Sequence, residues 1–247
     1  KIIIEQYLVK HIFKIADDPL YVENIGNMNN ADTIYSLASG KGRCGIAVIR
    51  ISGPNANHAL SLLTQRVPSN LPKPRRLVKS TIFGLKTDRK LDQALIVRFL
   101  KPESFTGEDL VELHLHGGAA VIKAVIGNLS EIQNLRPAEA GEFTRRAFEN
   151  GRMDLTEVEG LADLINAETE MQRQQAFRQL EGELGELHER WRSTIVNALA
   201  YMEAHIDFAE AELSRKEVFK NLRPALDLVE EMHRYLLDGR RGEILRD

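Results

Sequence analysis

Residues 104–118, SFTGEDLVELHLHGG, carry the pattern that decides how this part of the chain folds. Side chains of an extended strand alternate between two faces, so a strand over 110–116 places Leu113 and Leu115 on one face. The other face then carries Glu112, His114 and His116. A double glycine follows, and it allows a close turn into the apolar-patterned segment 119–132. The stretch therefore predicts a strand with one polar face that leads into a helix.

Segments with strand and helix patterns alternate around this strand. Further strands are predicted at 33–38, 45–52, 77–85 and 91–100, with a short turn at Thr87–Asp88. Helices are predicted at 54–65, with Pro54 at an early position, and at 119–132. This mixture predicts an α+β protein whose mixed α/β domain occupies residues 31–140.

The second predicted domain, residues 141–247, is mostly helical and has the pattern of a partial bundle. Apolar residues recur there every three or four positions, which indicates helices with one apolar stripe each. A last helix is predicted at about 217–237, where Pro224 predicts a start, kink or break and Gly239 an end. Such stripes need cover from the first domain, a second copy or further helices. Their members are Leu155, Val158, Ala162, Ile165, Leu184, Leu187, Trp191, Ile195, Leu199, Met202 and Ile206.

Composition excludes several classes of protein. The 247 residues carry a net charge of −3, so the chain has no general basic field for nonspecific nucleic-acid binding. Cys44 is the single cysteine, which excludes an intrachain disulfide framework and fits a reducing compartment. No apolar run reaches the roughly 18 residues that span a bilayer, so we expect no membrane association. Residues 1–30 are an N-terminal extension with an amphipathic pattern but not the composition of a transit peptide.

Two motifs suggest small-molecule or metal sites. Residues 40–45, GKGRCG, match a dinucleotide fingerprint, but they precede a strand pattern rather than a helix, so a glycine turn between strands is favoured. His114 and His116 with Glu112 could bind a metal ion from one face of the strand. Because no second cluster with ligand spacing occurs, hydrogen bonding to a ligand or water is favoured. The sequence contains no G-x-x-x-x-G-K-[ST] motif.

Residues 141–170 form a third charged stretch, GEFTRRAFENGRMDLTEVEGLADLINAETE. Arg145, Arg146 and Arg152 lie there among many acidic residues. One interpretation is a solvated helix surface with weak ion pairs. The other is an anion clamp, in which an arginine binds a carboxylated ligand through two hydrogen bonds.

Four motifs together resemble the MnmE/TrmE family of tRNA-modification GTPases. They are DTIYSLASGKGRCGIAVIRISGP, PESFTGEDLVELHLHGG, RPAEAGEFTRRAFENGRMDLTEVEGLADLINAETE and AYMEAHIDF, and they occur in order between about residues 32 and 247. The sequences of these motifs are most similar to those of animal mitochondrial members, which implies a mitochondrial location. The resemblance implies a homodimerising, tetrahydrofolate-binding first domain and the first part of a helical domain, with the chain stopping before the GTPase domain.

The family's function is then an expectation for this chain. It implies modification of the wobble uridine C5 in tRNA together with a flavin-dependent partner protein, using 5-formyl- or 5,10-methylene-tetrahydrofolate. GTP, Mg²⁺ and K⁺ would belong to the missing GTPase domain, and no catalytic residue is assigned. By resemblance the folate contacts are Arg50, Glu112 and Arg152. Alternatives are a stand-alone folate-dependent one-carbon transferase, with His114 or His116 as acid or base, and a non-enzymatic dimerisation and docking module.

Overall fold

The computed structural model describes residues 32–40, 42–207 and 215–243. Its contacts divide the chain into two compact units, residues 1–152 and 153–247. The amphipathic pattern expected in residues 1–30 lies outside the described residues. Within the described helices, none is long and apolar enough to cross a membrane.

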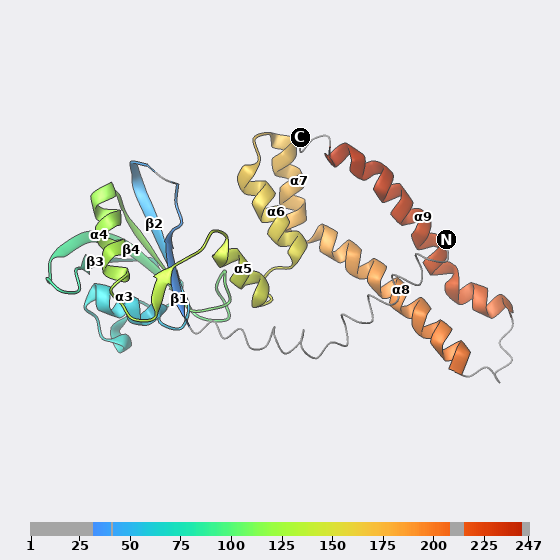
Figure 1. Cartoon of the computed structure of the whole chain (residues 1–247), viewed down its shortest axis with the longest axis horizontal. Helices are drawn as coiled ribbons and strands as arrows, with labels where there is room; N and C mark the ends of the chain where they lie inside the picture. Colours follow the sequence, from blue (N-terminus) through green and yellow to red (C-terminus); the bar gives the residue numbers. More distant parts are fainter. Residues whose placement is uncertain (1–31, 41, 208–214, 244–247) are drawn as a thin grey trace. The chain divides into compact units, whose positions relative to one another are not determined.

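The first unit is built on a six-stranded sheet in the order β3-β4-β5-β2-β1-β6 (Figure 1). All neighbouring strands are antiparallel except β1 and β6, which are parallel. The strands are β1 Thr33–Leu37, β2 Cys44–Ser52, β3 Val78–Phe83, β4 Lys90–Phe99, β5 Leu110–Gly117 and β6 Leu135–Pro137. The five strands predicted from the sequence are confirmed, whereas β6 was not predicted.

Two helices, α3 (Ala56–Thr64) and α4 (Ala119–Leu129), cover one face of this sheet (Figure 1). Burial alternates along the strands as the sequence predicts: Leu113 and Leu115 of β5 lie in the core, and Glu112 and His114 lie on the other face. The hydrophobic effect therefore sets the register, since a shift by one residue would bury the charged face. The core beneath α3 and α4 includes Ile49, Ile51, Leu60, Leu63, Ile82, Ile96, Val111 and Val125.

The described part of the glycine-rich segment, residues 40 and 42–45, belongs to the connection between β1 and the start of β2. The two strands pair antiparallel, with Leu37 opposite Ile49, so the segment joins a hairpin and does not open a helix. The structure thus confirms the interpretation as a turn between strands. A short 3₁₀ helix, Pro68–Asn70, follows α3, and α5 (Glu142–Glu149) completes the first unit.

The second unit is helical, as predicted. It consists of α6 (Leu155–Asn166), α7 (Glu170–Leu180), α8 (Glu183–Asp207) and α9 (Arg215–Glu243). A capping box begins each of α6 and α7, formed by Asp154 with Glu157 and by Thr169 with Gln172. The two helices pack closely at Gly160. A Cβ there would lie 2.7 Å from the backbone nitrogen of Leu180, so only glycine allows this approach.

The longest helix corrects two predictions made from the sequence. α9 runs from Arg215 to Glu243 with Pro224 inside it, so the helix neither begins nor breaks at the proline, and of the three predicted effects only a kink stays a prediction. It also continues past Gly239, which was predicted to end it. A proline removes one backbone hydrogen bond and a glycine weakens helix propensity, so α9, which packs against α8, forms against both local preferences. The apolar stripe of α8 stays partly uncovered, since Ile195, Leu199 and Ile206 are exposed.

Candidate functional site

The site is a cavity of about 360 Å³ in the first unit, at the polar face of the sheet. Its volume falls within the range of pockets that hold small molecules. Glu112 lies at its sheltered end, with 17% of the side chain exposed, whereas Arg75 and Glu103 are 59% and 68% exposed. The lining residues are Arg75, Phe99, Glu103, Ser104, Phe105, Leu110, Glu112 and Arg152. The cavity therefore combines a sheltered carboxylate, aromatic walls and a charged rim.

Arg50 and Glu112 lie opposite each other on the neighbouring strands β2 and β5. The Arg50 Nε and NH2 groups donate hydrogen bonds of 3.0 and 2.8 Å to Glu112 Oε1. Glu112 Oε2 lies 3.3 Å from Nε2 of His114, two residues along the same face. Because a carboxylate oxygen accepts about two hydrogen bonds, Oε1 is filled and Oε2 keeps capacity for a ligand.

Two aromatic rings hold the Arg50 guanidinium in place. Its Cζ lies 5.3 Å from the ring centroid of Phe105 and 5.6 Å from that of Phe143. Both distances are within the range of cation–π attraction. Phe105 comes from the loop after β4 and Phe143 from α5, so three separate segments fix the orientation of Arg50.

Arg152 reaches the cavity along the loop that contains Gly107. A Cβ at Gly107, whose φ is +76°, would lie 3.2 Å from Cγ of Arg152 and 3.0 Å from Cβ of Asn150. Asn150 Nδ2 also donates a 2.7 Å hydrogen bond to the carbonyl of Thr106. The glycine thus lets the arginine side chain pass close to the backbone.

A buried charge network lies behind the loop and α5. The Arg146 side chain is 1% exposed and contacts Asp32, Glu108 and Glu142 at 2.8 to 3.2 Å. Glu108 also accepts a 2.7 Å hydrogen bond from Ser52 Oγ of β2. Nε of Arg146 is buried with no hydrogen-bond partner among the described residues. The network ties α5, the loop and the sheet together, so Arg146 is structural and does not reach the cavity.

Charge pairing in this network shifts two acidic pKa values. Hydrogen bonds from Arg136 lower the pKa of Glu142 to about 2, against a smaller opposing effect of burial. For Asp32, burial raises the pKa, but hydrogen bonds from Arg136 and Arg146 outweigh it and the net shift is downward. Both carboxylates therefore stay ionised at neutral pH and support the arginines.

The two histidines of β5 have different hydrogen-bond partners. Nδ1 of His116 lies 2.7 Å from Oδ1 of Asp92, and the His116 backbone N–H donates to Oδ2 of the same residue. His114 pairs with Glu112, so the two rings have different partners. Among the described residues no group of three His, Cys, Asp or Glu side chains could hold a metal ion.

The structure brings the three predicted site residues together. Glu112 and Arg152 line the cavity, and Arg50 is hydrogen-bonded to Glu112 and packs on Phe105 of the wall. Sequence reasoning missed Phe105, Phe143 and Arg75. Phe105 lies within a quoted motif, but its contact with Arg50 joins positions 55 residues apart, and no spacing rule signals that.

Two protein-family models match most of the chain. Residues 33–152 match the model described as "GTP-binding protein TrmE N-terminus", and residues 155–247 match "MnmE helical domain". The junction between the matches falls where the two compact units meet.

Curated proteins give similar matches. The chain is 53% identical over 217 residues to "tRNA modification GTPase MnmE" of Parvibaculum lavamentivorans, covering 87% of the chain and 49% of that protein. It is 51% identical over 215 residues to the human "5-taurinomethyluridine-[tRNA] synthase subunit GTPB3, mitochondrial", covering 87% and 43%. It is 44% identical over 220 residues to "tRNA modification GTPase gtpbp3, mitochondrial" of Dictyostelium discoideum, with the same coverage. The chain thus spans about half the length of these relatives or less.

Proposed function

The chain belongs to the MnmE/TrmE family of tRNA modification GTPases, and we propose from this that its first unit binds a reduced folate for tRNA modification. The proposed reaction is modification at C5 of the wobble uridine. In it, 5-formyl- or 5,10-methylene-tetrahydrofolate is the one-carbon source and a flavin-dependent protein is the partner. The observation that carries the proposal is Glu112, a sheltered carboxylate held by Arg50 inside a cavity of about 360 Å³.

The donors and acceptors around Glu112 fit the pterin end of a folate. A pterin presents adjacent N–H donors, which a carboxylate accepts. Oε2 of Glu112 retains acceptor capacity, while the hydrogen bonds from Arg50 fix the orientation of the carboxylate. Phe105 and Phe99 supply apolar walls for a flat ring, and Arg152 supplies a cation for carbonyl or carboxylate groups.

We further propose that the first unit forms a homodimer through the sheet face that α3 and α4 leave open. Ile46 of β2 and Leu95 of β4 are 62% and 40% exposed on that face. Glu112 and His114 lie on the same face, so a second copy would enclose the end of the cavity. Contact with a second copy would remove these two apolar side chains from water.

We do not propose GTP hydrolysis for these 247 residues. The 247 residues contain no phosphate-cradling P-loop motif, and the relatives extend well beyond the matched region. We assign GTP, Mg²⁺ and K⁺ binding to that remainder. We also propose a mitochondrial location, because the human and Dictyostelium relatives carry that description, although the bacterial relative is as similar. Cell fractionation with a tagged full-length protein tests this location.

Titration calorimetry with 5-formyltetrahydrofolate tests the proposal, with mass in solution measured alongside. We expect saturation near one site per chain on a dimer and loss of binding in Glu112→Ala with unchanged thermal unfolding. The matched control is Glu131→Ala, an exposed carboxylate paired with Lys86 away from the cavity. Unchanged affinity in Glu112→Ala would reject the site.

One observation favours the transferase alternative. His114 Nε2 lies 3.3 Å from Glu112 Oε2, which places a potential acid or base beside the proposed ligand. A stand-alone transferase would consume the folate-borne carbon in the presence of a nucleophilic acceptor, whereas a binding module would only saturate. The docking-module alternative predicts neither binding nor turnover.

A further inference from the structure

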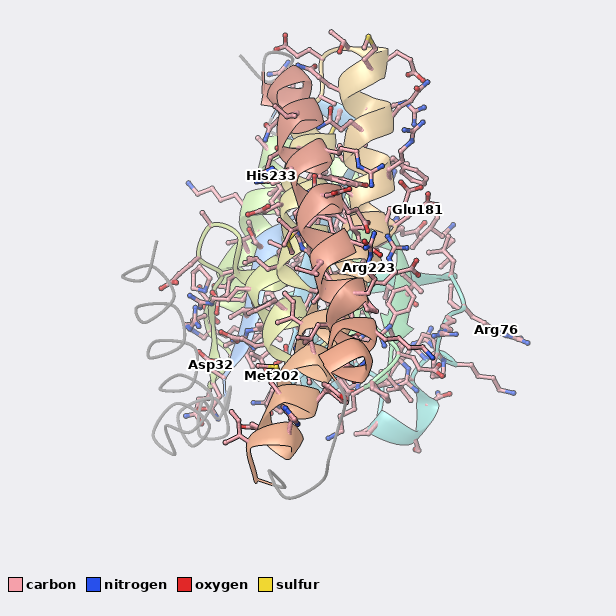
Figure 2. All side chains as sticks on the ribbon, turned by 90° about the vertical axis from the view of Figure 1, so that its right-hand side faces the viewer. Asp32, Arg76, Glu181, Met202, Arg223 and His233 are labelled. Carbon is pink, nitrogen blue, oxygen red and sulfur yellow. The ribbon has the colours of Figure 1, made fainter. Side chains whose placement is uncertain are left out.

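The rim of the cavity continues into an exposed basic segment. Residues 73–79, KPRRLVK, contain four basic residues and no acidic one, in a chain whose net charge is −3. Lys73, Arg76 and Lys79 are exposed, and within the described part of the chain none of the three forms a salt bridge. Figure 2 shows the side chain of Arg76 extending outward from the ribbon. The segment thus presents unpaired positive charge beside the proposed ligand site.

Arg75 links this segment to the cavity. Its φ of +59° is uncommon for a residue other than glycine. The Arg75 backbone N–H donates a 2.8 Å hydrogen bond to the carbonyl of Arg98, and its NH2 group lies 2.9 Å from Oε2 of Glu103. The Arg75 guanidinium therefore lies at the mouth of the cavity, where it is paired with the exposed carboxylate of Glu103.

The sheet sets the distance from this segment to Glu112. Val97 of β4 lies opposite Glu112 of β5. Leu95, two residues from Val97 on the same face of β4, lies opposite Lys79 of the edge strand β3. Lys79 thus shares the sheet face of Glu112. Because neighbouring strands are about 4.8 Å apart, β3 lies roughly 10 Å from β5. A ligand that begins at Glu112 and leaves past Arg75 therefore reaches the basic segment.

We propose that residues 73–79 receive the oligo-γ-glutamate tail of a folate whose pterin lies at Glu112. This inference rests on the proposed function. Each γ-linked glutamate adds one α-carboxylate, and the segment supplies a row of cations at the exposed end of the cavity, where the glutamate end of a folate would emerge. The ligand class is then a polyglutamylated reduced folate rather than the monoglutamate alone.

The tail contacts are exposed, so their effect is moderate and salt-dependent. Exposed ion pairs contribute little individually, and three of them together correspond to about a tenfold change in Kd. Screening shortens their range at high ionic strength. We therefore expect 5-formyltetrahydrofolate pentaglutamate to bind about tenfold more tightly than the monoglutamate in low salt. The difference should disappear at about 0.5 M salt.

The test compares Kd for the two folates in three forms of the chain. The variant Lys73→Ala/Arg76→Ala/Lys79→Ala should bind the monoglutamate normally and lose the pentaglutamate advantage. The control, Lys86→Ala/Arg89→Ala/Lys90→Ala, removes the same charge from exposed residues around the β3–β4 turn and should keep the advantage.

The outcomes separate this inference from the proposed function. If neither folate binds, the proposed function fails and the tail site fails with it. If both folates bind equally to the unaltered chain, the tail site is overturned while the folate site stands. Loss of the advantage in both triple variants would mean a general charge effect and would also overturn the inference. The inference would also be overturned if the triple variant at 73–79 lost tRNA binding but kept the pentaglutamate advantage, since the segment would then be an RNA contact.

Discussion

Arg50 directs two hydrogen bonds, of 2.8 and 3.0 Å, at a single carboxylate oxygen of Glu112. The other oxygen is left to His114 at 3.3 Å and to the cavity. This pairing explains how a charged carboxylate can lie in a sheltered place and still accept hydrogen bonds from a ligand. It also gives the arginine a positioning role in addition to any direct ligand contact.

Arg50→Lys should weaken folate binding about tenfold without unfolding the chain. Lysine keeps the charge but loses the planar fork that contacts Glu112 and the stacking between Phe105 and Phe143. Calorimetry gives the affinity and thermal unfolding the stability. The matched control is Arg145→Lys, a half-exposed arginine of α5 that pairs with Glu139. Equal affinities for Arg50→Lys and the unaltered chain would show that fork geometry is irrelevant.

Gly107→Ala should reduce both stability and ligand affinity. The positive φ costs about 1 kcal/mol for alanine, and the new Cβ would press on Asn150 and Arg152 at 3.0 and 3.2 Å. Gly141→Ala is the control, because Gly141 has a φ of +74° but nothing within 4 Å of its Cβ position. Both variants should lose stability in denaturant unfolding, Gly107→Ala more than Gly141→Ala because of these close contacts, and only Gly107→Ala should lose affinity. Affinity losses of equal size would contradict the proposed role of Arg152.

The first unit should lose stability between about pH 4.5 and pH 2. The folded-state pKa of Glu142 is lowered from 4.5 to about 2 by Arg136, so its contribution is complete above the unfolded pKa and lost as pH falls toward the folded one. The loss is up to about 3 kcal/mol. Urea unfolding followed by circular dichroism at pH 7, 4.5, 3 and 2 measures it. Glu142→Gln should flatten this dependence, whereas Glu139→Gln, at an exposed carboxylate, should leave it unchanged.

The sequence predicted the strands and the two faces of β5 because their signal is local. Alternation with a period of two residues placed Glu112 and His114 opposite the core leucines, and the structure agrees. The three-residue strand β6 is too short for any periodic signal and depends on pairing with β1. The wall of the cavity was also beyond prediction, because Phe105 and Phe143 meet Arg50 only after the sheet and α5 have assembled.

In the helical unit, local sequence signals led to wrong predictions of where a helix ends. Pro224 and Gly239 both oppose helix formation, yet α9 includes both. Long helices depend mainly on tertiary packing; α9 packs on α8 and contains the buried Leu228. The contribution of one contact between α8 and α9 to stability can be measured directly.

That contact joins Trp191 of α8 to Glu231 of α9. The indole Nε1–H donates a 3.0 Å hydrogen bond to Oε1 of Glu231, and the Trp191 ring meets Tyr235 edge-on at 5.4 Å. Because Trp191 is the single tryptophan, its fluorescence reports on the second unit and not the first. We expect Glu231→Ala to destabilise that unit by about 1 kcal/mol, since a partly exposed hydrogen bond to a charged acceptor is lost. The midpoint of urea unfolding by fluorescence should fall accordingly.

The neighbouring carboxylate supplies the control for this prediction. Glu230 is exposed on the same helix, and Glu230→Ala changes the charge and helix propensity in the same way without touching Trp191. Its fluorescence midpoint should stay at the unaltered value. If both variants shift the fluorescence midpoint equally, helix propensity and charge account for the effect. The hydrogen bond between α8 and α9 would then contribute nothing measurable to the packing of the two helices.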